Sequence, residues 1–237
     1  MKIKYNFHIH SCLSPCADDD MTPVNIVAFA KLNGIDAIAV ADHNAIENVQ
    51  VAMAAGEAFG VVVVPAIEVQ TNEDIHVLCM FESFDDLAAF RNSLELNVVK
   101  NRPEVFGNQL IVNEDDEVVG TLPDLLLINM FIDSCDIHKK AQEYGGIAIP
   151  AHIDREGNGM LAILGVVPDE FAVVELSYKA GDAIRDEYAE DHLVITDSDA
   201  HTLADIGEGK EMEVDELSVS GILNKLKAAE RKRIKRK

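Results

Sequence analysis

The sequence predicts a single domain of the α/β class. Seven short runs of apolar and β-branched residues alternate with longer amphipathic segments, which is the pattern of βα units that build a parallel sheet. The length of 237 residues fits one sizeable domain, and a hydrophobic content of 48% is enough to form its core. Metal-binding types of side chain follow several of these runs, so a functional site is expected at one edge of the sheet.

The positions of the strands and helices follow from these runs. Strands are expected at residues 3–9, 37–41, 61–69, 75–81, 147–151, 172–176 and 193–196. Helices are expected at about 23–32, 46–59, 84–99, 134–144, 182–190 and 214–234. The first helix has a defined start, because Thr22 can accept hydrogen bonds from its free N–H groups and Pro23 suits its first position. Gly34 can adopt the left-handed conformation that ends this helix.

One segment, at about 102–130, interrupts the alternation. Its sequence NQLIVNEDDEVVGT, at 108–121, predicts two short strands around an acidic turn. We therefore expect a small β-hairpin inserted in a domain that covers residues 1–224. Residues 225–237 form a basic tail, which we interpret as the end of a helix whose positive charge suits the helix dipole.

The charge of the chain limits its partners. The net charge is −22, but the first 224 residues hold twelve basic against 41 acidic residues, a net charge of −29. A body this acidic repels polyanions, so long nucleic acids are unfavourable partners, whereas a short oligonucleotide or another small phosphorylated substrate can still bind.

The sequence also indicates the cellular compartment in which the protein is expected. No run of about 18 apolar residues is present, so no membrane span is expected. The N-terminal residues lack the apolar stretch of a signal peptide. The four cysteines show no spacing typical of a disulfide framework, which favours reduced thiols. We therefore expect a cytoplasmic protein.

Histidine and carboxylate residues lie at the ends of the expected strands. His8 and His10 are two residues apart and leave the same face of the first strand. Similar residues adjoin the later strands: Asp42, His43, Glu68, His76, His152, Asp197, Asp199 and His201. In parallel α/β folds the carboxyl ends of the strands form the edge on which active sites are built. The sequence therefore predicts that these side chains converge.

This set of side chains is typical of a metal site. Imidazoles and carboxylates together suit Zn, Mn or Fe, and eight or more such groups exceed the needs of one tetrahedral ion. We therefore expect two or three divalent metal ions that share a bridging carboxylate. A thiolate site at Cys12 and Cys16 and a serine nucleophile at Ser14 or Ser177 are less well supported alternatives. The two remaining histidines are interpreted as structural: His138 and His192.

The order of these residues resembles the PHP family of phosphoesterases, named for polymerase and histidinol phosphatase. The resemblance rests on HIH at 8–10, DH at 42–43, Glu68 with His76, PAH at 150–152 and SDAH at 198–201. These motifs extend from residue 7 to residue 201. The resemblance implies a distorted (β/α)7, TIM-like barrel with a trinuclear metal site on its carboxyl rim, which agrees with the seven expected strands.

The resemblance also implies how the ligands are shared among three metal positions. The first position would use His8, His10, Glu68 and Asp199, and the second would share Glu68 and add His76 and His152. The third would use His43, His201 and a residue from the loop after His10. Many family members have a histidine in that loop, where this chain has PCADDD. Asp18 is therefore the expected ligand, with Asp20 as the alternative.

The activity implied by the resemblance is metal-dependent phosphoester hydrolysis by a bridging hydroxide. The expected substrate is a small phosphomonoester, such as a histidinol-phosphate-like compound or a nucleotide. Glu68, Asp199, Arg155 and Asp197 are the residues expected to take part in catalysis, with Arg155 or Lys179 binding phosphate and Asp197 or Asp42 orienting imidazoles. Exonuclease action on short oligonucleotides and a non-catalytic metal-binding module are the alternatives.

Overall fold

Strands and helices alternate over residues 1–234, the part of the chain that the computed structural model describes; side chains are described up to residue 230. The strands are β1 (Lys2–Ile9), β2 (Ala37–Val40), β3 (Val62–Val63), β4 (Ala66–Gln70), β5 (His76–Met80), β6 (Leu110–Val112), β7 (Val118–Thr121), β8 (Ile147–Pro150), β9 (Val173–Ser177), β10 (Leu193–Asp197) and β11 (Lys210–Glu213). The helices are α1 (Pro23–Leu32), α2 (Val49–Phe59), α3 (Phe84–Asn92), α4 (Pro103–Phe106), α5 (Ser134–Glu143), α6 (Met160–Leu164), α7 (Asp182–Ala189), α8 (Val219–Ile234) and the 3-10 helix η1 (Leu203–Ile206). The predicted α/β class is therefore confirmed.

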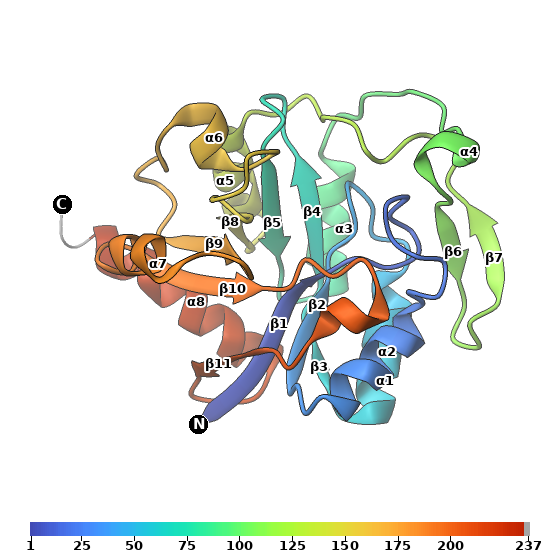
Figure 1. Cartoon of the computed structure of the whole chain (residues 1–237), viewed down its shortest axis with the longest axis horizontal. Coiled ribbons are helices and arrows are strands. Elements are labelled where there is room, and N and C mark those ends of the chain that lie inside the picture. Colours follow the sequence, from blue (N-terminus) through green and yellow to red (C-terminus); the bar gives the residue numbers. More distant parts are fainter. Residues whose placement is uncertain (235–237) are drawn as a thin grey trace.

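The strands pair in four separate sheets. One has the order β11-β1-β2-β3, another β4-β5-β8, and the pairs β9-β10 and β6-β7 complete the set. Isolated parallel bridges join Ile9 to Ala200 and His43 to Glu68 at one edge of the fold. Among the described residues no closed, continuously hydrogen-bonded barrel is formed. The fold is mixed α/β, and the β6-β7 pair confirms the expected hairpin, which lies to one side of the molecule (Figure 1).

The expectation of an all-parallel sheet is wrong for β5. This strand runs antiparallel to both β4 and β8. Only five residues connect β4 to β5, which is too short for the crossover that parallel strands require. The reversal has a consequence for function, because it places the first residue of β5, His76, opposite Gln70 at the last position of β4.

Other differences from the expected elements have local causes. The third apolar run contains Pro65, which cannot donate to a sheet ladder, and it splits into β3 and β4 on either side of that residue. β11 was not expected because its sequence KEME is mostly polar; it pairs antiparallel with β1 at the edge of the sheet. The cap of α1 is confirmed: the Asn25 N–H donates to Thr22 Oγ1, and Gly34 has φ of +70°.

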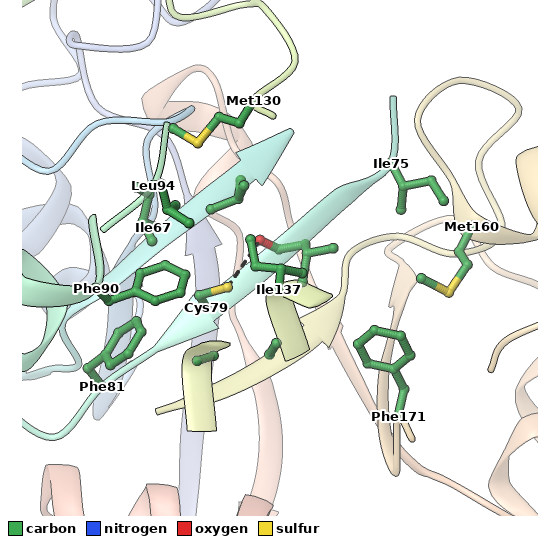
Figure 2. Packing of buried hydrophobic residues seen from close by; sticks show 14 of the residues in the cluster. Ile67, Ile75, Cys79, Phe81, Phe90, Leu94, Met130, Ile137, Met160 and Phe171 are labelled. Atoms are coloured by element: carbon green, nitrogen blue, oxygen red, sulfur yellow. Dashed lines mark hydrogen bonds between the residues drawn. The ribbon is translucent and has the colours of Figure 1, made fainter. Parts of the chain in front are cut away.

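The hydrophobic core lies on both sides of the strands. Figure 2 shows the part between β4, β5 and the neighbouring helices, where Phe81, Phe90 and Ile137 pack around Cys79. On the other side, α8 packs Ile222, Leu223 and Leu226 against the sheet; all are buried. The expected basic tail, 225–237, therefore begins within a packed helix, and residues 235–237 lie outside the described part. None of the helices within residues 1–234 is both long and apolar enough to cross a membrane.

Gly146 gives a test of this packing. A Cβ atom there would lie 2.4 Å from Cε1 of Phe81 and 2.9 Å from the carbonyl oxygen of Met80. Because such overpacking strains a core, Gly146→Ala should lower the free energy of unfolding by about 1–3 kcal/mol, measured by urea denaturation. Gly157→Ala is the control, since its Cβ would meet nothing within 4 Å. Equal stability of the two variants would contradict the packing described here.

Candidate metal centre

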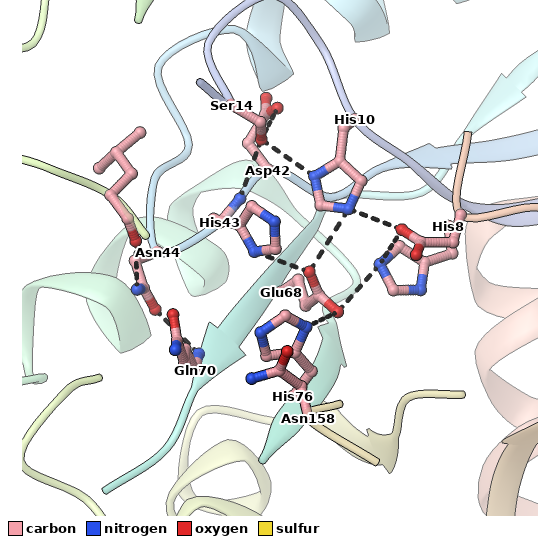
Figure 3. A network of polar contacts seen from close by, with 12 residues as sticks. His8, His10, Ser14, Asp42, His43, Asn44, Glu68, Gln70, His76 and Asn158 are labelled. Carbon is pink, nitrogen blue, oxygen red and sulfur yellow. Dashed lines mark hydrogen bonds and ion pairs between the residues drawn. The ribbon is translucent and has the colours of Figure 1, made fainter. Parts of the chain in front are cut away.

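The side chain of Glu68 lies at the centre of a cluster of histidines. Its two carboxylate oxygens are surrounded by imidazole nitrogens of five histidines, which come from four separate segments of the chain. Figure 3 shows four of these histidines around the carboxylate: His8, His10, His43 and His76. Three nitrogens lie near Oε1 of Glu68: His76 Nδ1 at 2.9 Å, His8 Nε2 at 3.2 Å and His152 Nε2 at 3.2 Å. Two lie near Oε2: His43 Nδ1 at 2.9 Å and His10 Nε2 at 3.4 Å. Glu68 and all five histidines are buried. The predicted convergence is therefore present.

Asp199 forms a second carboxylate of this cluster. Its Oδ1 lies 2.9 Å from His10 Nε2 and 3.5 Å from His8 Nε2, and its Oδ2 accepts from Arg155 Nη1 at 2.5 Å. The Nδ1 atom of His201 lies 2.8 Å from the backbone oxygen of Asp199. Arg155 therefore contacts the cluster directly, although 44% of its side chain is exposed.

The backbone at the rim is strained where it delivers ligand-type side chains. His152 has φ of +30° and Asp199 has φ of +49°, both in a region that non-glycine residues rarely occupy. Such conformations cost free energy and concentrate at functional sites, where the surrounding structure holds them. The strain therefore supports a function for this edge of the fold.

Three groups of side chains have the spacing that a metal ion requires. They are His8 with His10 and Glu68, His43 with Glu68 and His76, and His10 with His43 and His201. His8 Nε2, His43 Nδ1 and Glu68 Oε2 are also buried without a hydrogen-bond partner. Buried polar atoms are rarely left unpaired, and imidazole nitrogens that face a carboxylate oxygen without a hydrogen bond fit a shared cation. The donor set therefore suits divalent metal ions.

The pKa shifts of most residues in this cluster favour the protonation states that bind a metal ion. Burial alone would raise the pKa of Glu68, but the imidazoles of His76, His8 and His43 outweigh it and hold this pKa well below the usual value. Burial lowers the pKa of His10 well below its usual value and also lowers that of His43, which favours the neutral, metal-binding form of both rings. Burial also opposes charge on His8, yet nearby carboxylates, first that of Glu175, raise its pKa well above normal. Metal binding at His8 must therefore release a proton.

The tautomer of His10 is fixed by a chain of hydrogen bonds. The hydroxyl of Ser14 donates to Asp42 Oδ1 at 2.7 Å, so its oxygen accepts from Nδ1–H of His10 at 2.9 Å. Asp42 is held in turn by the backbone N–H and hydroxyl of Ser11. Nε2 of His10 is thereby left with its lone pair facing Glu68 and Asp199. Asp42 acts on a histidine as the sequence predicts, but through Ser14, which the sequence does not single out as an orienting residue.

Glu175 is a functional residue that the sequence analysis missed. It lies in β9 and is buried, and its Oε2 accepts from Nδ1–H of His8 at 2.9 Å. This bond directs Nε2 of His8 toward Glu68. A carboxylate inside the apolar run AVVELS was the available signal, because an unpaired buried charge is costly.

Asp197 lies behind the cluster. Its Oδ1 accepts from the backbone N–H of Phe7 at 2.5 Å, and its Oδ2 is buried without a partner. Burial, with the nearby charge of Glu175, raises the pKa of Asp197 to about 8. This carboxyl therefore anchors β1 rather than an imidazole, which differs from its expected orienting role.

The remaining candidates are spread around the centre. Asp18 is exposed, its backbone N–H donates to the His201 oxygen at 2.9 Å, and its side chain belongs to none of the three metal-sized groups. Lys179 and Asp20 are also exposed. Cys12 is buried and Cys16 is exposed, and neither belongs to a metal-sized group. The other two histidines contact different aromatic rings, His138 that of Phe171 and His192 that of Tyr188.

Known proteins share this fold at low sequence identity. No family model matches the chain, and no curated protein is similar to it in sequence. Endonuclease Q from Pyrococcus furiosus aligns with 96% of this chain at a TM-score of 0.68 and 18% identity. A protein from Bifidobacterium adolescentis described as a metal-dependent phosphoesterase aligns over 95% of this chain and 96% of its own, at a TM-score of 0.59 and 16% identity.

A third similar structure is described as containing a PHP-like domain. It is a two-domain protein from Bacteroides vulgatus with a predicted PHP-like metal-dependent phosphoesterase, and it aligns with 98% of this chain and 63% of its own, at a TM-score of 0.58 and 15% identity. This chain spans only 56% of the length of endonuclease Q. Identities this low establish a shared fold and leave the activity to be argued from the site.

The role of Glu175 can be tested by metal binding. Glu175→Gln removes the carboxylate that orients His8, so we expect the affinity for Zn²⁺ or Mn²⁺ to fall about 10–100-fold, as measured by competition with a chelator. Glu73→Gln is the control, because Glu73 accepts from Ser134 and, within the described residues, forms no ion pair with a histidine of the cluster. An unchanged affinity in Glu175→Gln would show that His8 needs no such support.

Proposed function

Because the chain has the fold of PHP-like metal-dependent phosphoesterases, we propose that it belongs to that family and hydrolyses phosphoesters with divalent metal ions. In this proposal the separate sheets correspond to a distorted (β/α)7 barrel. The observation that supports it best is the buried Glu68 carboxylate, which lies within 3.4 Å of nitrogens from five histidines. A non-catalytic scaffold would have no need for so complete a donor set.

Each residue of the cluster would have a defined role in metal binding. Glu68 would bridge two ions, with His8, His10, Asp199, His76 and His152 completing their ligands, and His43 and His201 would hold a third with Asp18 or Asp20. Bound Zn, Mn or Fe ions supply Lewis acidity, which activates water and neutralises charge on phosphoryl oxygens. Glu175 and the Asp42–Ser14 pair hold the imidazoles in the tautomers that this requires.

Arg155 is the residue that would bind the phosphate. Its guanidinium is paired with Asp199 at the edge of the cluster yet remains 44% exposed, so its other nitrogen donors can reach a ligand. Guanidinium groups match phosphate oxygens in geometry and charge. The expected substrate is a small phosphomonoester, such as a histidinol-phosphate-like compound or a nucleotide. The four cysteines are all free, which fits the expected cytoplasmic location.

Nuclease action on short oligonucleotides is the second candidate. It is favoured by the fold shared with endonuclease Q, whose structure is known in complex with a 27-mer duplex that carries an abasic lesion. The net charge of −29 on residues 1–224 disfavours long nucleic acids, since they would be repelled at long range. A non-catalytic metal-binding module is the remaining alternative.

Substitution of Glu68 tests the proposed activity. The protein loaded with Mn²⁺ or Zn²⁺ should release p-nitrophenol from p-nitrophenyl phosphate, and Glu68→Ala should abolish both the bridged metals and this release, because the shared ligand is lost. Glu57→Ala on the exposed face of α2 is the control and should keep both. Turnover that survives in Glu68→Ala would refute the assignment, and a metal-loaded protein without any turnover would favour the non-catalytic module.

A further inference from the structure

A cavity of about 540 Å³ adjoins the metal centre. Arg155 and Asp199 line it on the side of the cluster, and Tyr178, Lys179 and Lys210 are also among its lining residues. Its volume falls in the range of pockets that bind small molecules. A phosphate held at Arg155 would therefore have its leaving group beside this cavity.

The cavity gathers basic residues, which are scarce in the rest of the protein. Three of the twelve basic residues within positions 1–224 line it: Arg155, Lys179 and Lys210. Within the described residues, neither lysine has a carboxylate within 4.0 Å. Four acidic residues also line the cavity, and one of them, Asp199, is paired with Arg155; the others are Asp197, Asp205 and Glu208. In so acidic a chain, two ammonium groups without an ion pair are free to bind an anion.

Lys210 is also held in place. Its Nζ lies 5.1 Å from the centre of the Tyr178 ring, within the range of a cation–π contact. β11, of which Lys210 is the first residue, pairs with β1 through the Tyr5–Lys210 register. An ammonium group ordered in this way loses less conformational entropy when it binds a ligand.

We propose that this cavity receives the leaving group of the substrate and that Lys179 and Lys210 bind a second acidic group on it, a carboxylate or a phosphate. The substrate class is thus a phosphomonoester of a small organic acid or of a second phosphate-bearing molecule. The inference rests on the proposed phosphoesterase function, because it assumes that the first phosphate binds at the metal centre.

Binding of matched phosphonates tests this inference without turnover. ω-Phosphonocarboxylates and alkylphosphonates of the same chain length differ only in an end carboxylate, and their C–P bonds resist phosphoesterases. Calorimetric titration of the metal-loaded protein should show about tenfold tighter binding of the carboxylate at the best chain length. Lys179→Ala and Lys210→Ala should each reduce this preference, whereas Lys31→Ala, on an exposed site of α1, should not.

The outcomes separate this inference from the proposed function. Equal affinities at every chain length, or a preference unchanged in both lysine variants, would overturn the leaving-group inference alone. Failure of the proposed function is read separately, as the absence of p-nitrophenyl phosphate turnover. A preference that disappears in the lysine variants supports the inference whatever the turnover.

A second feature, the inserted segment 102–130, contacts the loop that follows His10. The Leu110 N–H donates to the Cys12 oxygen at 2.9 Å, and Asn108 Nδ2 donates to Asp19 Oδ2 at 2.8 Å. Asn48 joins both segments, because its Nδ2 donates to Ser11 Oγ and to the Leu110 oxygen, each at 3.0 Å. The insertion is therefore bonded to this loop at several points along it.

The two segments are closest at Gly107. This residue has φ of +104°, and a Cβ atom on it would lie 1.9 Å from the carbonyl oxygen of Pro15. Only glycine fits there, since both the backbone conformation and the close approach exclude a side chain. The far end of the same loop is tied to the metal centre, because the Asp18 N–H donates to the His201 oxygen.

We infer that the insertion positions the loop of residues 11–20 over the His10, His43 and His201 group and so secures the metal ion bound there. Gly107→Ala should push Pro15 away and remove about one ion per chain, counted by elemental analysis after reconstitution and gel filtration. Gly120→Ala, in the same hairpin, is the matched control, because its Cβ would come no nearer than 3.6 Å to another residue.

A milder variant guards against misfolding. Asn108→Ala removes the bond to Asp19 without adding atoms, and it should weaken the least tightly bound ion in a chelator titration while the other ions are retained. A metal count and chelator profile equal to those of the unaltered protein in both Gly107→Ala and Asn108→Ala would overturn the inference. Loss of all ions together in a folded Asn108→Ala protein would also contradict it, because the effect would not be confined to that group.

Discussion

The burial of one carboxylate, that of Glu68, is the constraint on which the rest of this structure depends. An ionised carboxylate taken out of water is costly unless positive charge or hydrogen-bond donors surround it. Here five imidazoles surround it, and three further carboxylates, those of Asp199, Glu175 and Asp42, act on those imidazoles directly or through Ser14. Metal ions would neutralise the negative charge of these carboxylates better than protons do, because one metal ion can accept lone pairs from several ligands at once.

Strand direction decides how the cluster is assembled. Most ligand-type residues follow parallel strands and reach the rim from their carboxyl ends. β5 runs in the opposite direction, so its first residue, His76, meets Glu68 from the same side. A connection of only five residues after β4 is sufficient to force this reversal. A short turn thus supplies a ligand that a regular βα unit would have placed at the opposite end of its strand.

Two features next to the metal centre shape the site in this strongly acidic chain: a cavity lined by basic residues and an inserted segment. Basic residues are scarce, and three of them line one cavity beside the cluster. The inserted segment meets the loop after His10 at a point where only glycine fits, at Gly107. The first feature concerns what binds next to the metal centre, and the second concerns how firmly the centre itself is held.

The sequence by itself determined the α/β class, most element positions and the convergence of six histidines with Glu68 and Asp199, because strand ends and ligand-type residues coincide in the chain. The reversal of β5 follows from the five-residue connection after β4, although the pattern of βα units predicts a parallel strand there. The tertiary structure alone decided the pairing of polar β11 with β1, the role of Glu175 and the position of Ser14 between His10 and Asp42. These depend on contacts between residues far apart in the chain; Glu175, for example, lies 167 positions from His8. Periodicity and local spacing in the sequence do not reveal such contacts, because they form when distant side chains pack together and when buried charges must be paired.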